Sequence, residues 1–234
     1  MRIVPITGAL LDLADALRAG DLDVCMAALE RDPSLATAYF GDDREARTAL
    51  HVITDFPGHV PHAPQLIGLL AAAGADVDAP FVGAHAETPL HWAASCDDLD
   101  AIEALLDAGA DIGAPGGVLT GGPPLDDAVI FGQWAAARVL VSRGVTVQLF
   151  HAAALGLTAV VEDALALEPP AQEITNALWH ACRGGSAVAA ELLLDAGGDP
   201  DWVGYDEMTP RDAAADSGDD AVIALLAPRT PQRP

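Results

Sequence analysis

Four residues that could bind zinc lie close together in the segment HVITDFPGHVPH. They are His51, Asp55, His59 and His62. Imidazole nitrogens and carboxylate oxygens are ordinary Zn²⁺ ligands, and a His-x-x-His pair suits one half of a site. However, the spacing matches no established zinc signature, and the prolines and glycine around it indicate an irregular loop. We therefore interpret the cluster as a surface loop, predict no metal and no cofactor, and keep zinc binding as a weaker alternative.

A second set, Asp127, His151 and His180, consists of residue types that carry out acid–base chemistry, and Arg183 follows closely. An imidazole takes up and releases a proton near neutral pH, and a carboxylate can orient it or share a metal ion with it. No glycine-rich dinucleotide loop, P-loop, G-x-S-x-G or H-E-x-x-H motif accompanies these residues. The interpretation we favour is that the histidines are structural, so the sequence leans against catalysis without deciding it.

The charge of the chain limits its partners. There are 35 acidic and 11 basic residues, which gives a net charge of −24. Such a field repels phosphate, so we predict no binding to nucleic acid or to an anionic membrane surface. A basic protein partner would suit this charge, and so would imitation of a nucleic acid by the acidic surface. A bias in composition is the simpler explanation of the acidity.

Cysteine usage and hydropathy indicate the cellular compartment. The three cysteines, Cys25, Cys96 and Cys182, are far apart and odd in number, which is typical of a reducing environment. The N-terminal segment shows no signal-peptide pattern, and no uncharged apolar run reaches the roughly 20 residues of a membrane helix. We therefore expect a soluble, cytoplasmic protein.

The elements that carry these residues follow a repeated pattern. Five related motifs begin first helices: TALHVI (48–53), TPLHWAA (88–94), PPLDDAV (123–129), ALWHAC (177–182) and TPRDAAA (209–215). After several of them comes a second apolar segment at helical spacing that ends in a glycine, as at Gly74 and Gly109. The pattern resembles the ankyrin repeat, whose period is about 33 residues.

The resemblance implies an all-α solenoid of stacked antiparallel helix pairs with hairpin-like finger loops. One pair cannot bury its own apolar face, so neighbouring pairs must stack. We predict a single domain over residues 1–227 and a frayed tail over 228–234. The predicted units lie near 10–35, 44–79, 84–113, 120–146, 147–168, 174–200 and 206–227. Gly132 and Gly156 are closer together than one period, which predicts that the finger between them is nearly absent.

In the family, the concave face formed by first helices and fingers is the usual binding surface. The resemblance implies that partner-binding residues lie there, with Phe131, Trp202 and Tyr205 as large anchors. The full predicted set is Trp92, Ser95, Cys96, Ile130, Phe131, Leu155, Arg183, Trp202 and Tyr205. The structural alternative is that Phe131 or Trp202 packs beneath its own loop. We predict a protein-interaction module; the oligomeric state stays open, with a monomer favoured.

The same alignment assigns other polar residues to columns, that is, to equivalent positions in successive repeats. His51 and His91 stand in the histidine position of the motif, where the family uses a bracing residue between successive repeats, and Trp179 takes that position in a later repeat. Asp127, His151 and His180 are aligned one residue further on, which would place them along one strip of the groove. That strip is the basis of the alternative function, an enzyme or a small-molecule or metal-binding protein.

Overall fold

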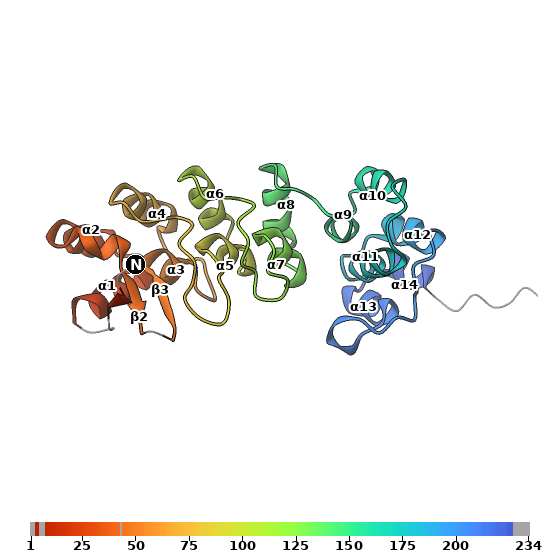
Figure 1. Cartoon of the computed structure of the whole chain (residues 1–234), viewed down its shortest axis with the longest axis horizontal. Coiled ribbons are helices and arrows are strands. Elements are labelled where there is room, and N and C mark those ends of the chain that lie inside the picture. Colours follow the sequence, from red (N-terminus) through yellow and green to blue (C-terminus); the bar gives the residue numbers. More distant parts are fainter. Residues whose placement is uncertain (1–2, 5–7, 43, 227–234) are drawn as a thin grey trace, which may run out of the picture. The chain divides into compact units, whose positions relative to one another are not determined.

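The computed structural model describes residues 3–4, 8–42 and 44–226, and this part of the chain contains fourteen α-helices in seven consecutive pairs (Figure 1). The pairs are α1 (Ala9–Ala19) with α2 (Leu22–Arg31), α3 (Ala49–Thr54) with α4 (Ala63–Ala72), α5 (Pro89–Ser95) with α6 (Leu99–Asp107), α7 (Pro124–Ile130) with α8 (Trp134–Ser142), α9 (Leu149–Leu155) with α10 (Thr158–Leu165), α11 (Ala171–Arg183) with α12 (Ala187–Asp195), and α13 (Pro210–Ser217) with α14 (Asp220–Leu225). The predicted helix pairs are therefore confirmed. The tail predicted to fray lies outside the described residues.

The chain divides into two compact units, residues 1–145 and 146–234. In the first unit, α1, α3, α5 and α7 form one row and α2, α4, α6 and α8 form a second row (Figure 1). In the second unit, α11 packs against both α9 and α13, and α12 packs against both α10 and α14. The boundary falls in the short link between α8 and α9, where the sequence predicts almost no finger. A single continuous domain over residues 1–227 stays a prediction.

Threonine and histidine together begin the first helices of two repeats. At Thr88, the N-cap of α5, the imidazole Nδ1 of His91 accepts from the Thr88 backbone N–H at 3.0 Å and lies 2.9 Å from the Thr88 hydroxyl. Thr48 and His51 repeat this capping box at α3. A side chain that satisfies backbone groups at the N-terminus stabilises a short helix that would be marginal alone.

The fingers of the first unit pair with one another, and this adds β-structure that the all-α prediction did not include. Strands β1 (Ile3–Val4), β2 (Tyr39–Gly41) and β3 (Ala46–Thr48) form a sheet in which β1 is parallel to β2 and β2 is antiparallel to β3. Val82, in the next finger, exchanges two 2.9 Å backbone hydrogen bonds with Ala46. The sheet is small, and the architecture remains a helical solenoid.

Small residues allow the helices of the second unit to approach closely. Its core contains many alanines, among them Ala152, Ala177 and Ala189, which are fully buried. At the end of α11, a Cβ on Gly184 would lie 2.0 Å from the Ala154 carbonyl oxygen of α9. Because α9 and α11 touch through backbone at this point, even one methyl group does not fit.

We expect Gly184→Ala to lower the free energy of unfolding by roughly 1–3 kcal/mol, as overpacking usually does. The measurement is urea unfolding followed by circular dichroism. Gly68→Ala is the control, because Gly68 lies inside α4 and a Cβ there meets nothing within 4 Å. That change should stabilise the protein by about 0.5–1 kcal/mol, since alanine favours a helix over glycine. A neutral or stabilising Gly184→Ala would show that α9 and α11 are not in backbone contact.

Candidate functional site

Buried side chains that donate hydrogen bonds link successive repeats and hold their first helices in place. His51 Nε2 lies 3.1 Å from the carbonyl oxygen of Glu87, and His91 Nε2 lies 3.0 Å from that of Gly122. In the second unit, the indole N–H of Trp179 donates to the carbonyl of Met208 at 3.0 Å. Each carbonyl belongs to the residue that precedes the N-cap of the next first helix. The bracing role predicted for His51 and His91 is therefore confirmed, and Trp179 performs it with another side chain.

Burial determines the chemistry of these histidines. It lowers the pKa of His51 to about 4, with the nearby Arg47 also lowering it, and it lowers the pKa of His91. Both rings are therefore neutral at physiological pH. Their Nδ1 atoms accept from threonine N–H groups, so Nε2 carries the proton and donates to the neighbouring repeat. Neutral, fully bonded imidazoles of this kind are structural braces rather than proton carriers.

His151 also occupies the bracing position, and this corrects its predicted column. Its Nδ1 accepts from the Gln148 backbone N–H at 3.1 Å, in a capping box equivalent to those of His51 and His91. His151 is thus not one residue beyond the motif histidine. It is fully buried, as is Asp127, and His180 is nearly so. Asp127 belongs to the first unit and the two histidines to the second, and a shared catalytic strip stays a prediction.

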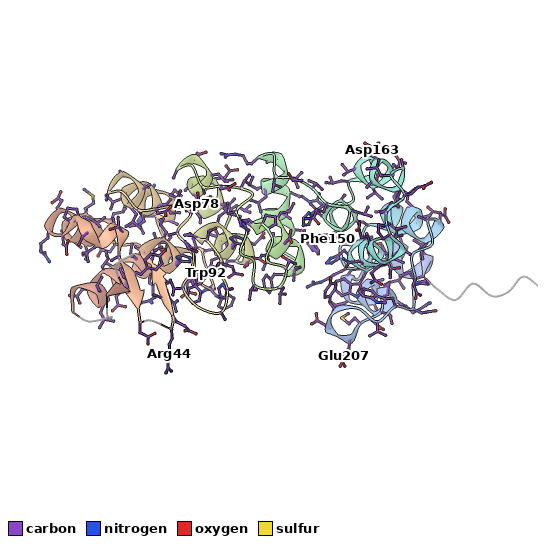
Figure 2. All side chains as sticks on the ribbon, in the orientation of Figure 1. Arg44, Asp78, Trp92, Phe150, Asp163 and Glu207 are labelled. Atoms are coloured by element: carbon purple, nitrogen blue, oxygen red, sulfur yellow. The ribbon has the colours of Figure 1, made fainter. Side chains whose placement is uncertain are left out.

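The first unit contains a pocket of about 420 Å³ between its fingers and the ends of its first helices. We call it the finger pocket. Its lining comes from Thr54, Asp55, Phe56, His85, Glu87, Trp92, Ser95, Cys96, Val118, Phe131 and Gln133. Four of the predicted partner-binding residues therefore meet at one cavity. Trp92, on α5, is labelled in Figure 2. Phe56 and Phe131 keep 85% and 44% of their surface exposed, so the pocket has open aromatic walls.

Glu87 is the charged centre of the finger pocket. Its Oε2 accepts from the Trp92 indole N–H at 2.8 Å and lies 3.2 Å from His85 Nδ1. Its Oε1 accepts from the Val118 backbone N–H at 2.9 Å. The carboxylate thus joins two fingers and α5. Although Glu87 is only 6% exposed, it is among the residues that line the pocket.

Asp127 lies behind Glu87 and is fully buried. Neither of its carboxyl oxygens has a hydrogen-bond donor within normal geometry, and a Cβ on Gly117 would lie 2.9 Å from Oδ1. Burial, then the charge and hydrogen bonding of Glu87, then the charge of Asp126, raise the pKa of Asp127 to about 8. At neutral pH the Asp127 carboxyl is therefore mostly protonated, so that the neighbouring acids do not all carry charge.

Cys96 lines the finger pocket as a thiol. Its Sγ lies 3.8 Å from the Thr54 carbonyl oxygen, and burial raises its pKa to about 11, with Asp98 and Asp55 adding to the shift. A cysteine nucleophile needs a lowered pKa so that the thiolate is present. Cys96 can thus contribute apolar contact, while nucleophilic chemistry at neutral pH is disfavoured.

The second unit brings several predicted residues into an aromatic cluster. His180 lies 5.0 Å from Phe150, which is labelled in Figure 2, and 5.5 Å from Tyr205, measured between ring centroids. Arg183 lies over the Trp179 ring at 5.6 Å. These five residues form what we call the aromatic cluster. Tyr205 is 49% exposed, so part of the cluster can meet a partner.

The remaining predicted partner-binding residues lie in different environments. Trp202 packs on its own loop, because a Cβ on Gly204 would be 2.4 Å from its ring, and this fits the structural alternative. Ile130 is half-buried. Leu155 is only 4% exposed, which corrects its assignment to the surface. The end of α9 is covered there by the end of α11 at Gly184 and by Ser186, whose hydroxyl donates to the Ala154 carbonyl at 3.1 Å.

The four residues of the zinc alternative have separate roles. His51 is a brace, Asp55 pairs with Arg47 at 2.6 Å, and His62 Nδ1 lies 3.0 Å from the Gly20 carbonyl oxygen. The backbone N–H of His59 donates to Asp98 at 2.6 Å. Within residues 3–4, 8–42 and 44–226, no three His, Cys, Asp or Glu side chains are grouped to hold a metal ion. Nor does any helix in those ranges combine the length and apolar character needed to cross a membrane.

Four residues of the finger pocket were not singled out by the sequence: Thr54, Phe56, Glu87 and Gln133. Glu87 directly precedes the Thr88-Pro89 cap, and a carboxylate at that point of a finger is the signal that would have identified it. Gln133 donates from Nε2 to the Ser95 carbonyl at 2.9 Å and so joins α8 to the end of α5. Gln133 follows the repeat motif at a position that the motif does not specify, so the sequence gives no signal that it lines the pocket.

Comparisons with known proteins agree with the repeat architecture of the chain. The family model for ankyrin repeats (3 copies) matches residues 13–115. A mouse protein described as RelA-associated inhibitor is 37% identical over 105 residues, which cover 43% of this chain and 11% of that protein. The chain thus spans about a tenth of the length of this relative. The crystal structure of the human ASB11 ankyrin repeat domain has a TM-score of 0.56 and 19% identity, covering 93% of this chain and 98% of that one. At this identity the likeness concerns the fold alone.

Proposed function

We propose that this chain, which is an ankyrin-repeat protein, binds a partner protein through the finger pocket of its first unit. Ankyrin repeats are protein-interaction modules, and the name of the mouse relative describes an inhibitor associated with another protein. The aromatic cluster of the second unit is a second candidate contact region. We do not assign a catalytic role to either surface.

The observation that carries the proposal is the exposed aromatic wall of the finger pocket. Phe131 and Phe56 remain largely exposed beside a cavity whose other walls are braced by hydrogen bonds. Large apolar groups around a rigid hollow are typical anchor points of protein interfaces, where a few central residues contribute most of the affinity. The pocket is also the place where four residues predicted from the repeat columns meet.

We expect Phe131→Ala to weaken partner binding by about 1–3 kcal/mol, which is about 5- to 150-fold in Kd. A partner is first identified by affinity capture from the native cell with the wild-type chain and confirmed with purified proteins. The affinity of the variant for that partner is then measured by calorimetry. The control is Leu167→Ala, which removes an apolar side chain beyond α10 that is 83% exposed and so even more accessible than Phe131. An unchanged Kd for Phe131→Ala would contradict the proposed surface.

The alternative, an enzyme or ligand-binding protein built on Asp127, His151 and His180, has less support. None of these three residues lines the finger pocket, and Asp127 is connected to the pocket only through its hydrogen bond with Glu87. His151 is part of a capping box. Protein binding is therefore the function that the geometry supports best.

A further inference from the structure

We propose that the finger pocket receives an arginine side chain of the partner protein, with its guanidinium at Glu87 and against the exposed ring of Phe131. The inference rests on the proposed function and specifies the chemistry of the partner at one position.

The charge of the pocket favours a cation. Glu87 and Asp55 are the carboxylates that line it. Asp55 is paired with Arg47, whereas Glu87 pairs with no arginine in the described part of the chain. A carboxylate offers about four lone-pair positions, and the hydrogen bonds from Trp92, Val118 and the protonated Asp127 account for three. His85 Nδ1 lies 3.2 Å from Oε2 but makes no hydrogen bond to it. Glu87 can therefore accept one more donor from an occupant of the pocket.

Arg47 shows how a guanidinium fits this environment. Its Cζ lies 5.5 Å from the centroid of the Trp92 ring, and its Nη1 lies 2.6 Å from Asp55 Oδ2. Thus one arginine already combines an aromatic face with a carboxylate, and both of those groups also line the pocket. A planar guanidinium makes such contacts better than the compact ammonium of lysine, because it can stack and donate at the same time.

Other occupants fit less well. An acidic or phosphorylated side chain would meet Glu87 and Asp55 and be repelled at close range. A purely apolar side chain would fill the aromatic walls but remove water from the Glu87 carboxylate without replacing its hydrogen bond. The net charge of −24 would also draw a basic segment towards the protein. Arginine is the side chain that satisfies all of these conditions.

The test uses N-acetyl-arginine amide as the probe and the full chain as the target. Titration is followed by nuclear magnetic resonance at the indole N–H of Trp92, which is bonded to Glu87. We expect a saturable shift in the millimolar range, and no comparable shift with N-acetyl-citrulline amide, which is the uncharged analogue. N-acetyl-lysine amide should bind several-fold more weakly. Equal binding of the lysine or citrulline compound would overturn the assignment to arginine.

Two variants locate the probe. Glu87→Gln should weaken it roughly tenfold or more, because a hydrogen bond to a charged group is lost. Phe131→Ala tests the exposed wall and avoids the risk that a change at buried Glu87 disturbs folding. Glu162→Gln, an exposed carboxylate on α10, should leave the affinity unchanged. The proposal is overturned if Phe131→Ala binds the arginine probe as tightly as wild type does and a correctly folded Glu87→Gln does so too. If the partner protein depends on Phe131 while the arginine probe never saturates, only the arginine assignment fails and the proposed function stands.

Discussion

Trp179→Ala is expected to be the most destabilising single change in the second unit, with a loss of about 3–5 kcal/mol. Trp179 is the largest fully buried side chain of the chain's described part, and it belongs to the core of that unit. Its removal leaves a cavity and also leaves the Met208 carbonyl without its donor. Because neighbouring repeats stabilise one another, α11 and α13 should lose protection together. Urea unfolding and hydrogen exchange of the amides in both helices measure these effects.

Trp179→Phe separates the two contributions of the indole. It keeps most of the ring volume but removes the N–H group, so we expect a smaller loss of about 1–3 kcal/mol. Trp134→Ala is a matched control, since that tryptophan is half-buried at the start of α8 in the first unit. If Trp179→Ala cost no more than Trp134→Ala, the indole of Trp179 would not be a brace between repeats.

The helix pairs were predictable because the signals that begin and end them are local. In Thr88-Pro89-Leu90-His91, one short segment contains the N-cap, a proline suited to the first turn, a core residue and the brace. The glycines at the ends of second helices, such as Gly109 at φ 97°, are also local signals. Trp179 could be recognised in the histidine position because Leu178 and Ala181 match the motif on either side of it, although Asn176 and Ala177 replace the threonine and proline.

His151 was assigned to the wrong column because its repeat lacks the usual cap. Gln148 and Leu149 stand where Thr and Pro stand in the repeat of α5, so the alignment moved by one residue. The side chain of Gln148 performs the capping, which only the coordinates reveal. Leu155 was expected at the surface from its position in the repeat, but the close approach of Gly184 and Ser186 to the end of α9 buries it.

The finger pocket could be predicted only in part, because its walls come from segments far apart in the chain. Trp92, Ser95, Cys96 and Phe131 follow from repeat columns. The meeting of Glu87 with the Val118 N–H depends on the path of two long fingers, which carry no periodic signal. Phe56 lies in the insertion between α3 and α4, and an insertion has no counterpart in the other repeats. The paths of long loops therefore could not be predicted from the repeat pattern.

Asp127→Asn is expected to stabilise the protein in a pH-dependent way. The pKa of Asp127 is raised from 3.8 to about 8, first by burial and then by Glu87 and Asp126. Since the folded state holds this proton more tightly than the unfolded state, the contribution of Asp127 to stability is greatest below pH 4. It falls as the pH rises towards 8 and is constant above that. From pH 5 to pH 8, the stability of the variant relative to wild type should increase by on the order of 3 kcal/mol.

The comparison at each pH removes the contribution of the titrating groups that do not interact with Asp127, and so reports on Asp127 together with Glu87 and Asp126. Urea unfolding of the full chain at pH 5, 6.5 and 8 gives the difference in free energy of unfolding between the variant and wild type. Asp100→Asn removes an exposed carboxylate from the first turn of α6, and its difference from wild type should stay within about 0.5 kcal/mol at every pH. A pH-independent difference for Asp127→Asn would mean that Asp127 is already ionised in the folded state. Glu87 would then face a second full charge, and the pocket would attract cations more strongly than proposed here.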